Sequence, residues 1–232
     1  MHIYRDDQKI NLRSKIGKYA GISSLVILGG GMYLSFKFQS QVWYSLIALI
    51  LGFVLSQISI YFTNQYGRSP RPDQELDDAL KGLDDRYALY HYTSPVSHLL
   101  VGPAGIWILF PFHQKGKITY QEEKGRWNRK GGNLYLKFFA QDSIGRPTME
   151  IEAAKDRLAT FLEQIPEFDL PTLHAALIFT HEEAEVEAEN APSPTLHALQ
   201  FKKFIRKQEK GERSLSMSKV RTVQDALGET SF

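Results

Sequence analysis

Two uncharged stretches decide how the chain is organised: YAGISSLVILGGGMYLSF at residues 19–36 and VWYSLIALILGFVLSQISIYFT at residues 42–63. An α-helix rises about 1.5 Å per residue, so about 18 to 20 apolar residues cross the hydrocarbon layer of a bilayer. A cleaved signal peptide would have a shorter apolar region followed by an Ala-x-Ala-like site, and the sequence shows no such site. We therefore predict two transmembrane helices within residues 19–66, at about 19–36 and 42–63.

Charge is unevenly distributed along the 232 residues, although the formal net charge is only +2. Residues 1–18 hold five basic and two acidic side chains, whereas residues 68–232 hold 22 basic and 24 acidic ones. Basic residues that flank a span stay on the cytoplasmic side. We therefore expect a multi-pass protein of the cell membrane, with the N-terminus and the C-terminal domain in the cytoplasm and Lys37 outside. The absence of cysteine excludes disulfides and thiolate metal sites.

Small residues recur within both predicted spans. The first span contains Gly21 and the run 29–31, and the second contains Gly52 and Ser56 four residues apart. Small residues allow helices to approach closely in a membrane. We expect them to pack the two spans against each other, and the alternative is a homo-oligomer formed through the same faces.

After a Pro-containing linker at residues 67–72, the chain alternates helical and extended patterns. Leu76, Leu80 and Leu83 recur at helical spacing after Asp73, which can cap a helix. The β-rich runs lie at 87–92, 98–101, 106–112, 117–121, 134–139, 175–179 and 195–199, and further helices are predicted at 149–162, 200–210 and 218–227. This order predicts an α/β or α+β domain at 73–200, followed by a basic helix and tail at 201–232.

Within residues 73–180, three features occur together: the leucine-bearing helix, the run SHLLVGPAGIWI at 97–108, and GKI at 116–118 followed by Trp127. This combination resembles the nuclease-related domain family, known as NERD. Members of that family look like restriction endonucleases in fold. The resemblance therefore implies a mixed sheet flanked by helices, preceded in this chain by a transmembrane helical hairpin.

The resemblance also implies where an active site would lie. The family is thought to cut nucleic acid with a helix Glu, a strand Asp and a following Glu-x-Lys. The carboxylates hold a divalent ion beside the scissile phosphate, and the lysine positions or activates water. Aligned through the VGPAG turn, the chain has Ser97 at the Asp position, Phe110 at the Glu position and Phe112 at the Lys position. Only Glu75 matches the helix Glu.

These replacements imply a noncatalytic relative, in which Glu75, Ser97, Phe110 and Phe112 form a vestigial site and His98 lies next to it. We expect no catalytic residues, cofactor or metal. The alternative is an active, metal-dependent nuclease tethered to the membrane, which would need Mg²⁺ at a replacement ion site.

Other charged runs are less informative. Residues 122–124 contain a Glu-x-Lys, but they lie beyond the strand that should present it and are typical of an exposed hairpin tip. The acidic run 181–189 lacks the His-Glu-x-x-His spacing of a metal site and is typical of an exposed strand or loop. The remaining histidines are dispersed, which is typical of structural roles.

Near the C-terminus, four basic residues recur on one predicted helix and could contact phosphates or anionic lipid head groups: Lys202, Lys203, Arg206 and Lys207. The alternative is the exposed face of a packed helix. Because residues 68–232 are net negative, a membrane surface is favoured over nucleic acid. The sequence thus predicts a membrane-anchored domain that acts by binding or scaffolding, with the bilayer as its partner and its protein ligand unknown.

Overall fold

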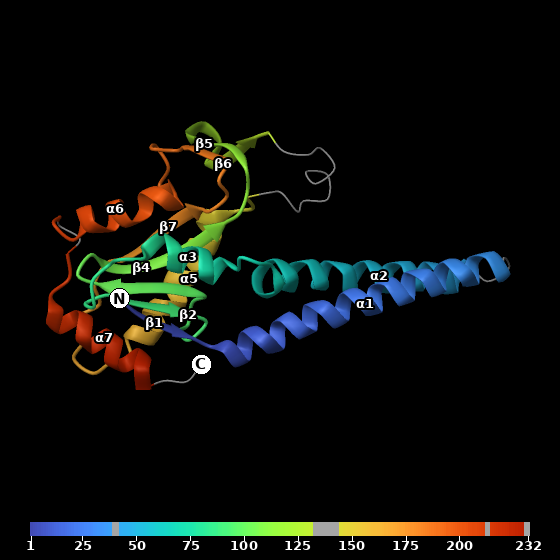
Figure 1. The fold of residues 1–232 in the computed structure, drawn as a ribbon, viewed down its shortest axis with the longest axis horizontal. Helices are drawn as coiled ribbons and strands as arrows, with labels where there is room; N and C mark the ends of the chain where they lie inside the picture. The colour runs from blue at the N-terminus through green and yellow to red at the C-terminus, as the bar shows by residue number, and fades with distance from the viewer. Residues whose placement is uncertain (39–41, 132–143, 212–213, 230–232) are drawn as a thin grey trace. The chain divides into compact units, whose positions relative to one another are not determined.

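The computed structural model describes residues 1–38, 42–131, 144–211 and 214–229, which form two compact units. One unit is residues 6–71, and the other combines residues 1–5 with the chain from Pro72 onward. Figure 1 shows both units. The smaller unit therefore interrupts the larger one in sequence.

The smaller unit is a helical hairpin of α1 (Asp7–Lys37) and α2 (Val42–Phe62), followed by a π-helical turn, η1 (Thr63–Gly67). The side chain of Asp6 accepts a hydrogen bond from the backbone N–H of Lys9 and so caps α1. Both helices are long and apolar enough to cross a membrane. The helix α1 begins well before the predicted span at residue 19.

Small residues line the contact between the two helices. A Cβ on Gly31 would lie 2.6 Å from the Cβ of Ala48, and one on Gly52 would lie 2.5 Å from the side chain of Leu28. The hydroxyl of Ser24 donates a 2.7 Å hydrogen bond to the carbonyl of Gly52. The prediction that small residues pack the two helices together is therefore confirmed at these positions, whereas no atom of the described residues lies within 4 Å of a Cβ on Gly29 or Gly30.

The larger unit is built on a six-stranded mixed sheet with the order β1-β2-β3-β4-β7-β9. Its strands are β1 (His2–Arg5), β2 (Ala88–His91), β3 (His98–Gly102), β4 (Gly105–Phe112), β7 (Leu173–Phe179) and β9 (Thr195–His197). The strands β2, β3 and β4 form an antiparallel meander, and β1, β7 and β9 pair in parallel with their neighbours. The predicted VGPAG turn is confirmed, because Gly102 pairs with Gly105.

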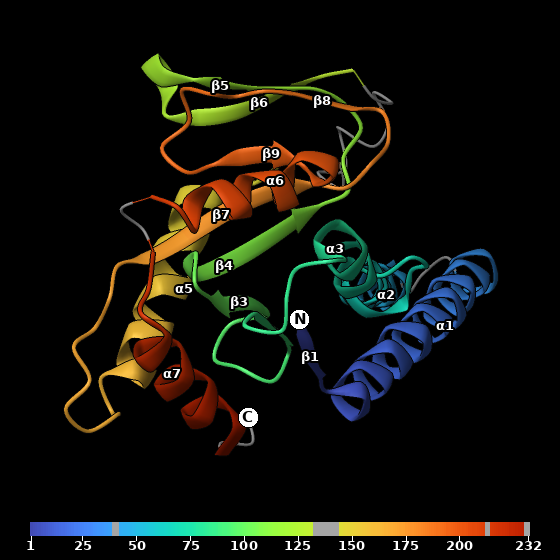
Figure 2. The ribbon, with the colours of Figure 1, turned by 60° about the vertical axis from the view of Figure 1, so that its left-hand side comes forward.

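Helices cover both faces of this sheet (Figure 2). On one face, α3 (Pro72–Leu80) and α6 (Ala198–Gln208) bury Leu76, Leu80, Phe201 and Ile205. On the other face lie α5 (Pro147–Leu162) and α7 (Met217–Glu229), with the apolar side chains Ile151, Ala154, Leu158, Leu162, Val220, Val223 and Leu227. Successive side chains along a strand point to opposite faces of the sheet, so they belong alternately to the two cores.

A second sheet, with the order β6-β5-β8, consists of β5 (Gly116–Gln121), β6 (Arg126–Lys130) and β8 (Ala184–Glu187). The 3₁₀ turn η2 (Glu122–Lys124) joins β5 to β6, so the Glu-x-Lys lies at a hairpin tip as the sequence predicts. The acidic run forms β8, which pairs in parallel with β5. The strand predicted at 134–139 lies outside the described residues.

The structure differs from the predicted boundaries at both ends of the larger unit. Residues 2–5, predicted as part of a basic segment spanning 1–18, form the edge strand β1. The helix α6 crosses the predicted boundary between residues 200 and 201, and its residues Phe201 and Ile205 are fully buried. The fold needs both segments because α6 covers one face of the sheet and β1 completes one edge.

One substitution tests the packing at the β3–β4 turn. A Cβ on Gly102 would lie 2.2 Å from Cδ1 of Tyr87, whose ring is buried and would have to shift. We expect Gly102→Ala to lower the free energy of unfolding by about 1–3 kcal/mol, as overpacking does. In contrast, Gly228→Ala in α7 meets open space and should leave stability unchanged or raise it by up to about 1 kcal/mol. Urea unfolding of both variants checks this, and equal midpoints would contradict the expected clash.

Candidate functional site

The side chain of Glu75 lies at the centre of a polar cluster at one edge of the main sheet. It comes from the first turn of α3 and is 8% exposed. The hydroxyl of Thr180 donates a 2.7 Å hydrogen bond to its Oε2, and Nδ1 of His113 lies 2.8 Å from its Oε1. The ring of His181 lies 5.0 Å from that of His113. We call these four residues the Glu75 cluster.

Strand pairing explains why these residues meet. The strands β4 and β7 run in parallel, and their last residues, Phe112 and Phe179, are register partners. His113 follows β4, and Thr180 and His181 follow β7. All three side chains therefore lie at the carboxyl ends of these two strands. Carboxyl ends of parallel strands are where α/β sheets commonly bind ligands.

Hydrogen bonds give the two imidazoles different roles. The Nδ1–H of His113 can donate to Glu75, and the side chain of His113 is 44% exposed. Nδ1 of His181 accepts a 3.0 Å hydrogen bond from the backbone N–H of Glu183, so the neutral ring carries its proton on Nε2. The two imidazoles therefore use their Nδ1 atoms in opposite ways, one as a donor and the other as an acceptor.

The other residues of the predicted vestigial site do not join Glu75. Phe110 and Phe112 pack on the opposite face of the sheet, in the core covered by α5 and α7, where Phe112 stacks on Phe179. Ser97 is exposed in the turn before β3. The structure thus brings Glu75 together with His113, Thr180 and His181, none of which the sequence analysis selected.

The Glu75 cluster contains a single carboxylate. Mg²⁺ prefers several oxygen ligands in a near-octahedral arrangement, whereas both oxygens of Glu75 already contact Thr180 and His113. Among the residues that the structure describes, no group of three His, Asp or Glu side chains is arranged to hold a metal ion.

A second polar cluster lies on the same face of the sheet and contains His98. Arg5 forms ion pairs with Asp73, at 2.8 Å from its Nε, and with Asp77. Nε2 of His91 lies 3.0 Å from Oδ1 of Asp77, and Nδ1 of His91 lies 2.8 Å from Nδ1 of His98. We call these five residues the clasp.

Three of the five clasp residues are buried, whereas the side chains of Arg5 and Asp77 are 23% and 21% exposed. Asp73 and His91 have no exposed surface, and His98 is 3% exposed. Burial lowers the pKa of His98 well below its ordinary value, and the nearby His91 and Arg5 lower that pKa further. His98 is therefore neutral near pH 7 in the folded protein.

The predicted anionic-surface residues are divided between two roles. Nζ of Lys202 donates to the carbonyl of Lys81 at 2.9 Å, and Arg206 donates to the carbonyl of Gly82 at 2.8 Å. Cations stabilise the carbonyls that follow a helix C-terminus, here that of α3. Lys203 and Lys207 are exposed on α6.

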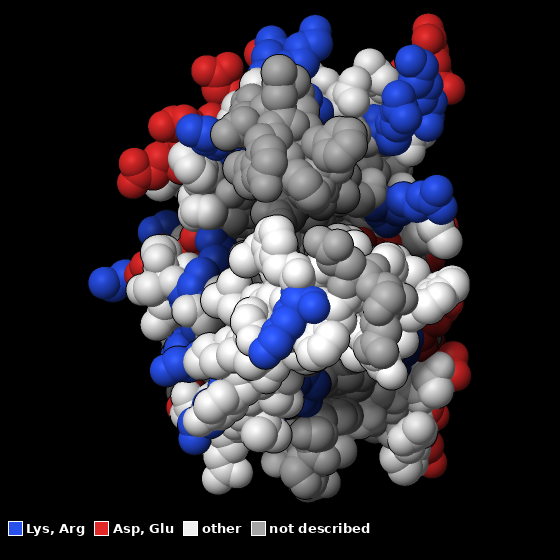
Figure 3. All heavy atoms as spheres, turned by 90° about the vertical axis from the view of Figure 1, so that its right-hand side faces the viewer, with Lys and Arg blue, Asp and Glu red and all other residues white. Residues whose placement is uncertain are grey.

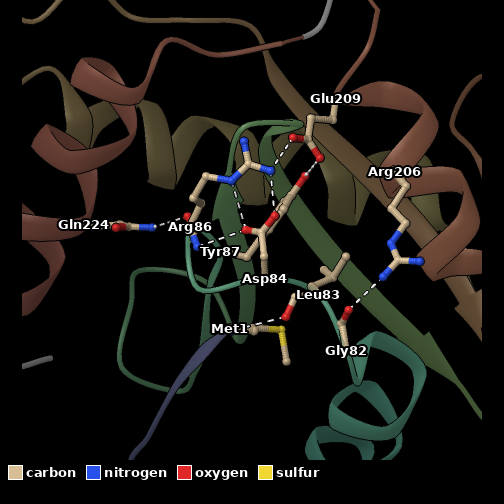
Figure 4. A network of polar contacts seen from close by, with 9 residues as sticks. All are labelled: Met1, Gly82, Leu83, Asp84, Arg86, Tyr87, Arg206, Glu209 and Gln224. Carbon is tan, nitrogen blue, oxygen red and sulfur yellow. Dashed lines mark hydrogen bonds and ion pairs between the residues drawn. The ribbon is translucent and has the colours of Figure 1, made fainter.

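A further network ties α6 to the chain between α3 and β2 (Figure 4). Arg86 pairs with Asp84 and with Glu209, each at 2.6 Å, and its hydrogen bond lowers the pKa of Asp84. The hydroxyl of Tyr87 donates to Glu209, and burial together with that carboxylate raises the pKa of Tyr87. These contacts assign α6 a structural role in the domain.

Figure 3 shows one face of the molecule, on which basic and acidic side chains are interspersed among uncharged ones.

The fold and the two clusters define an α/β protein with a mixed sheet and two long apolar N-terminal helices. No protein-family model, curated protein or solved structure matches the chain.

Proposed function

We propose that this chain is a membrane-anchored, noncatalytic relative of the nuclease-related domain family that acts by binding or scaffolding at the cytoplasmic face. The observation that carries the proposal is which residues occupy the family's active-site positions and what those residues contact. Phe110 and Phe112, which stand where the family places a carboxylate and a lysine, are partly buried and pack against an apolar core. The remaining carboxylate, Glu75, is held by Thr180 and His113.

The arrangement of elements supports the family assignment. The main sheet and its helices occur along the chain as α3, the meander β2 to β4, α5 and the parallel strand β7, with β5 and β6 of the second sheet between β4 and α5. The mixed sheet has helices on both faces, which agrees with the restriction-endonuclease-like architecture that the resemblance implies.

The connectivity of the hairpin supports membrane anchoring with both ends on one side. The strand β1 precedes α1 and pairs with β2, which follows α2. A hairpin with two spans returns the chain to the side from which it started, so β1 and β2 can meet. The basic residues between 1 and 18 favour the cytoplasm for that side.

Incubating the full-length protein with nucleic acid and Mg²⁺ or Mn²⁺ tests the proposal. The complete chain is needed because residues 1–5 belong to the domain. We expect no cleavage above the level of a Glu75→Gln control. Cleavage that depends on both the ion and Glu75 would establish the alternative, a membrane-tethered nuclease.

A further inference from the structure

The clasp joins the two points at which the chain enters and leaves the hairpin unit. Arg5 is the last residue of β1, just before α1, and Asp73 lies in the first turn of α3. The pairing of Arg5 with Asp73 and Asp77 therefore holds β1 to α3, in addition to the backbone pairing of β1 with β2.

The contact between His91 and His98 limits how many protons the clasp can hold. A hydrogen bond between two Nδ1 atoms 2.8 Å apart needs a proton on one atom and a lone pair on the other. If both rings are fully protonated, two N–H groups point at each other and the contact cannot persist. The pair thus keeps its geometry with one imidazolium at most.

Charge counting gives the same limit. The charges of Arg5 and one imidazolium balance the two carboxylates of Asp73 and Asp77. A second imidazolium would leave an uncompensated positive charge among buried groups, which is strongly unfavourable.

Aromatic and apolar groups also border the pair. The ring of Tyr92 lies edge-on to His98 at 4.9 Å, and the neighbouring strand β4 presents the apolar Leu109 on this face. The ion pairs of the clasp bring Arg5 from β1 and the two carboxylates of α3 to the pair.

We propose that the clasp is an acid-sensitive device. It holds β1 in the sheet near neutral pH and releases β1 when both His91 and His98 become imidazolium ions. In the released state, Arg5 separates from α3, and residues 2–5 lose their pairing with β2. Acidification would then change how the domain is connected to the hairpin, without unfolding the remaining strands.

The sign of the pH dependence follows from linkage. The folded clasp holds His98 neutral, whereas the opened state binds a proton with a pKa of about 6.5. Opening therefore becomes easier as pH falls below about 6.5, by up to about tenfold for each pH unit.

Amide hydrogen exchange on the full-length protein in nanodiscs tests this between about pH 7.5 and 5, the range in which histidines titrate. Protection factors correct for the intrinsic pH dependence of exchange. In the wild type, we expect protection of residues 2–5 to fall by up to about tenfold per pH unit below about 6.5, while β9, at the other edge of the sheet, keeps its protection. Constant protection of β1, or an equal loss in β9, would overturn the proposal.

Two variants separate the clasp from other histidines. His98→Gln keeps a polar side chain that does not titrate, so protection of β1 should become independent of pH. His2→Gln removes the exposed histidine of β1 itself and should behave as the wild type. If protection of β1 in His98→Gln still depended on pH as in the wild type, or if that dependence were lost in His2→Gln, the pH dependence would not come from the clasp. If His98→Gln does not fold, the pH dependence of β1 protection relative to that of β9 in the wild type still tests the proposal.

Discussion

Replacing Arg5 with alanine is expected to lower the free energy of unfolding of the larger unit by about 3 kcal/mol, the lower end of the cost of breaking a buried ion pair, because Arg5 itself is 23% exposed. The substitution removes an ion-pair partner from Asp73, which has no exposed surface, and from Asp77. The effect should appear in urea unfolding of the full-length chain in detergent micelles.

Arg126→Ala is the matched control for this substitution. Arg126 begins β6 and is exposed, so its loss should change stability by less than about 0.5 kcal/mol. If Arg5→Ala were equally mild, residues 1–5 would not be an integral part of the domain.

Phe201→Ala in α6 should lower the free energy of unfolding by about 3–5 kcal/mol, because it removes a large side chain from a closed core. Phe201 is fully buried between α6 and the sheet, together with Leu76, Leu80 and Trp107. The same urea unfolding experiment measures the loss.

The same helix offers a control only two residues away. Leu199 is 87% exposed, so Leu199→Ala should change stability by less than about 0.5 kcal/mol. Similar, small losses for the two variants would mean that α6 is not part of the packed core of the domain.

Local patterns were sufficient for the hairpin and for most elements of the sheet. The uncharged stretches predicted α1 and α2, since length and hydropathy alone decide whether a helix can span. The VGPAG run predicted the β3–β4 turn, because turn residues act within a few positions of the chain.

Long-range pairing could not be predicted in the same way. Nothing in the four residues of β1 identifies their partner, which lies beyond two long helices. The Glu75 cluster depends on the parallel pairing of β4 with β7, which brings His113 and Thr180 together from distant positions. The sequence feature that could have indicated this cluster is that His113 and Thr180 each directly follow a strand.

The alignment with the family motif also could not predict on which face of the sheet a residue lies. Correspondence with a family motif gives positions along β4, but not which helix those positions meet. In the structure, Phe110 and Phe112 point toward the core under α5, whereas Glu75 is held on the side of α3.

The pairing of His2 with Ala88 has a consequence for biosynthesis. The ribosome makes β1 before the hairpin and β2 after it, so this edge of the sheet cannot close until both apolar helices have been translated. During that interval, residues 2–5 have no strand to join, and closing so long a loop carries an entropic cost. The packing of α1 against α2 shortens that loop by bringing the two ends of the hairpin together, so folding of the hairpin assists closure of the sheet.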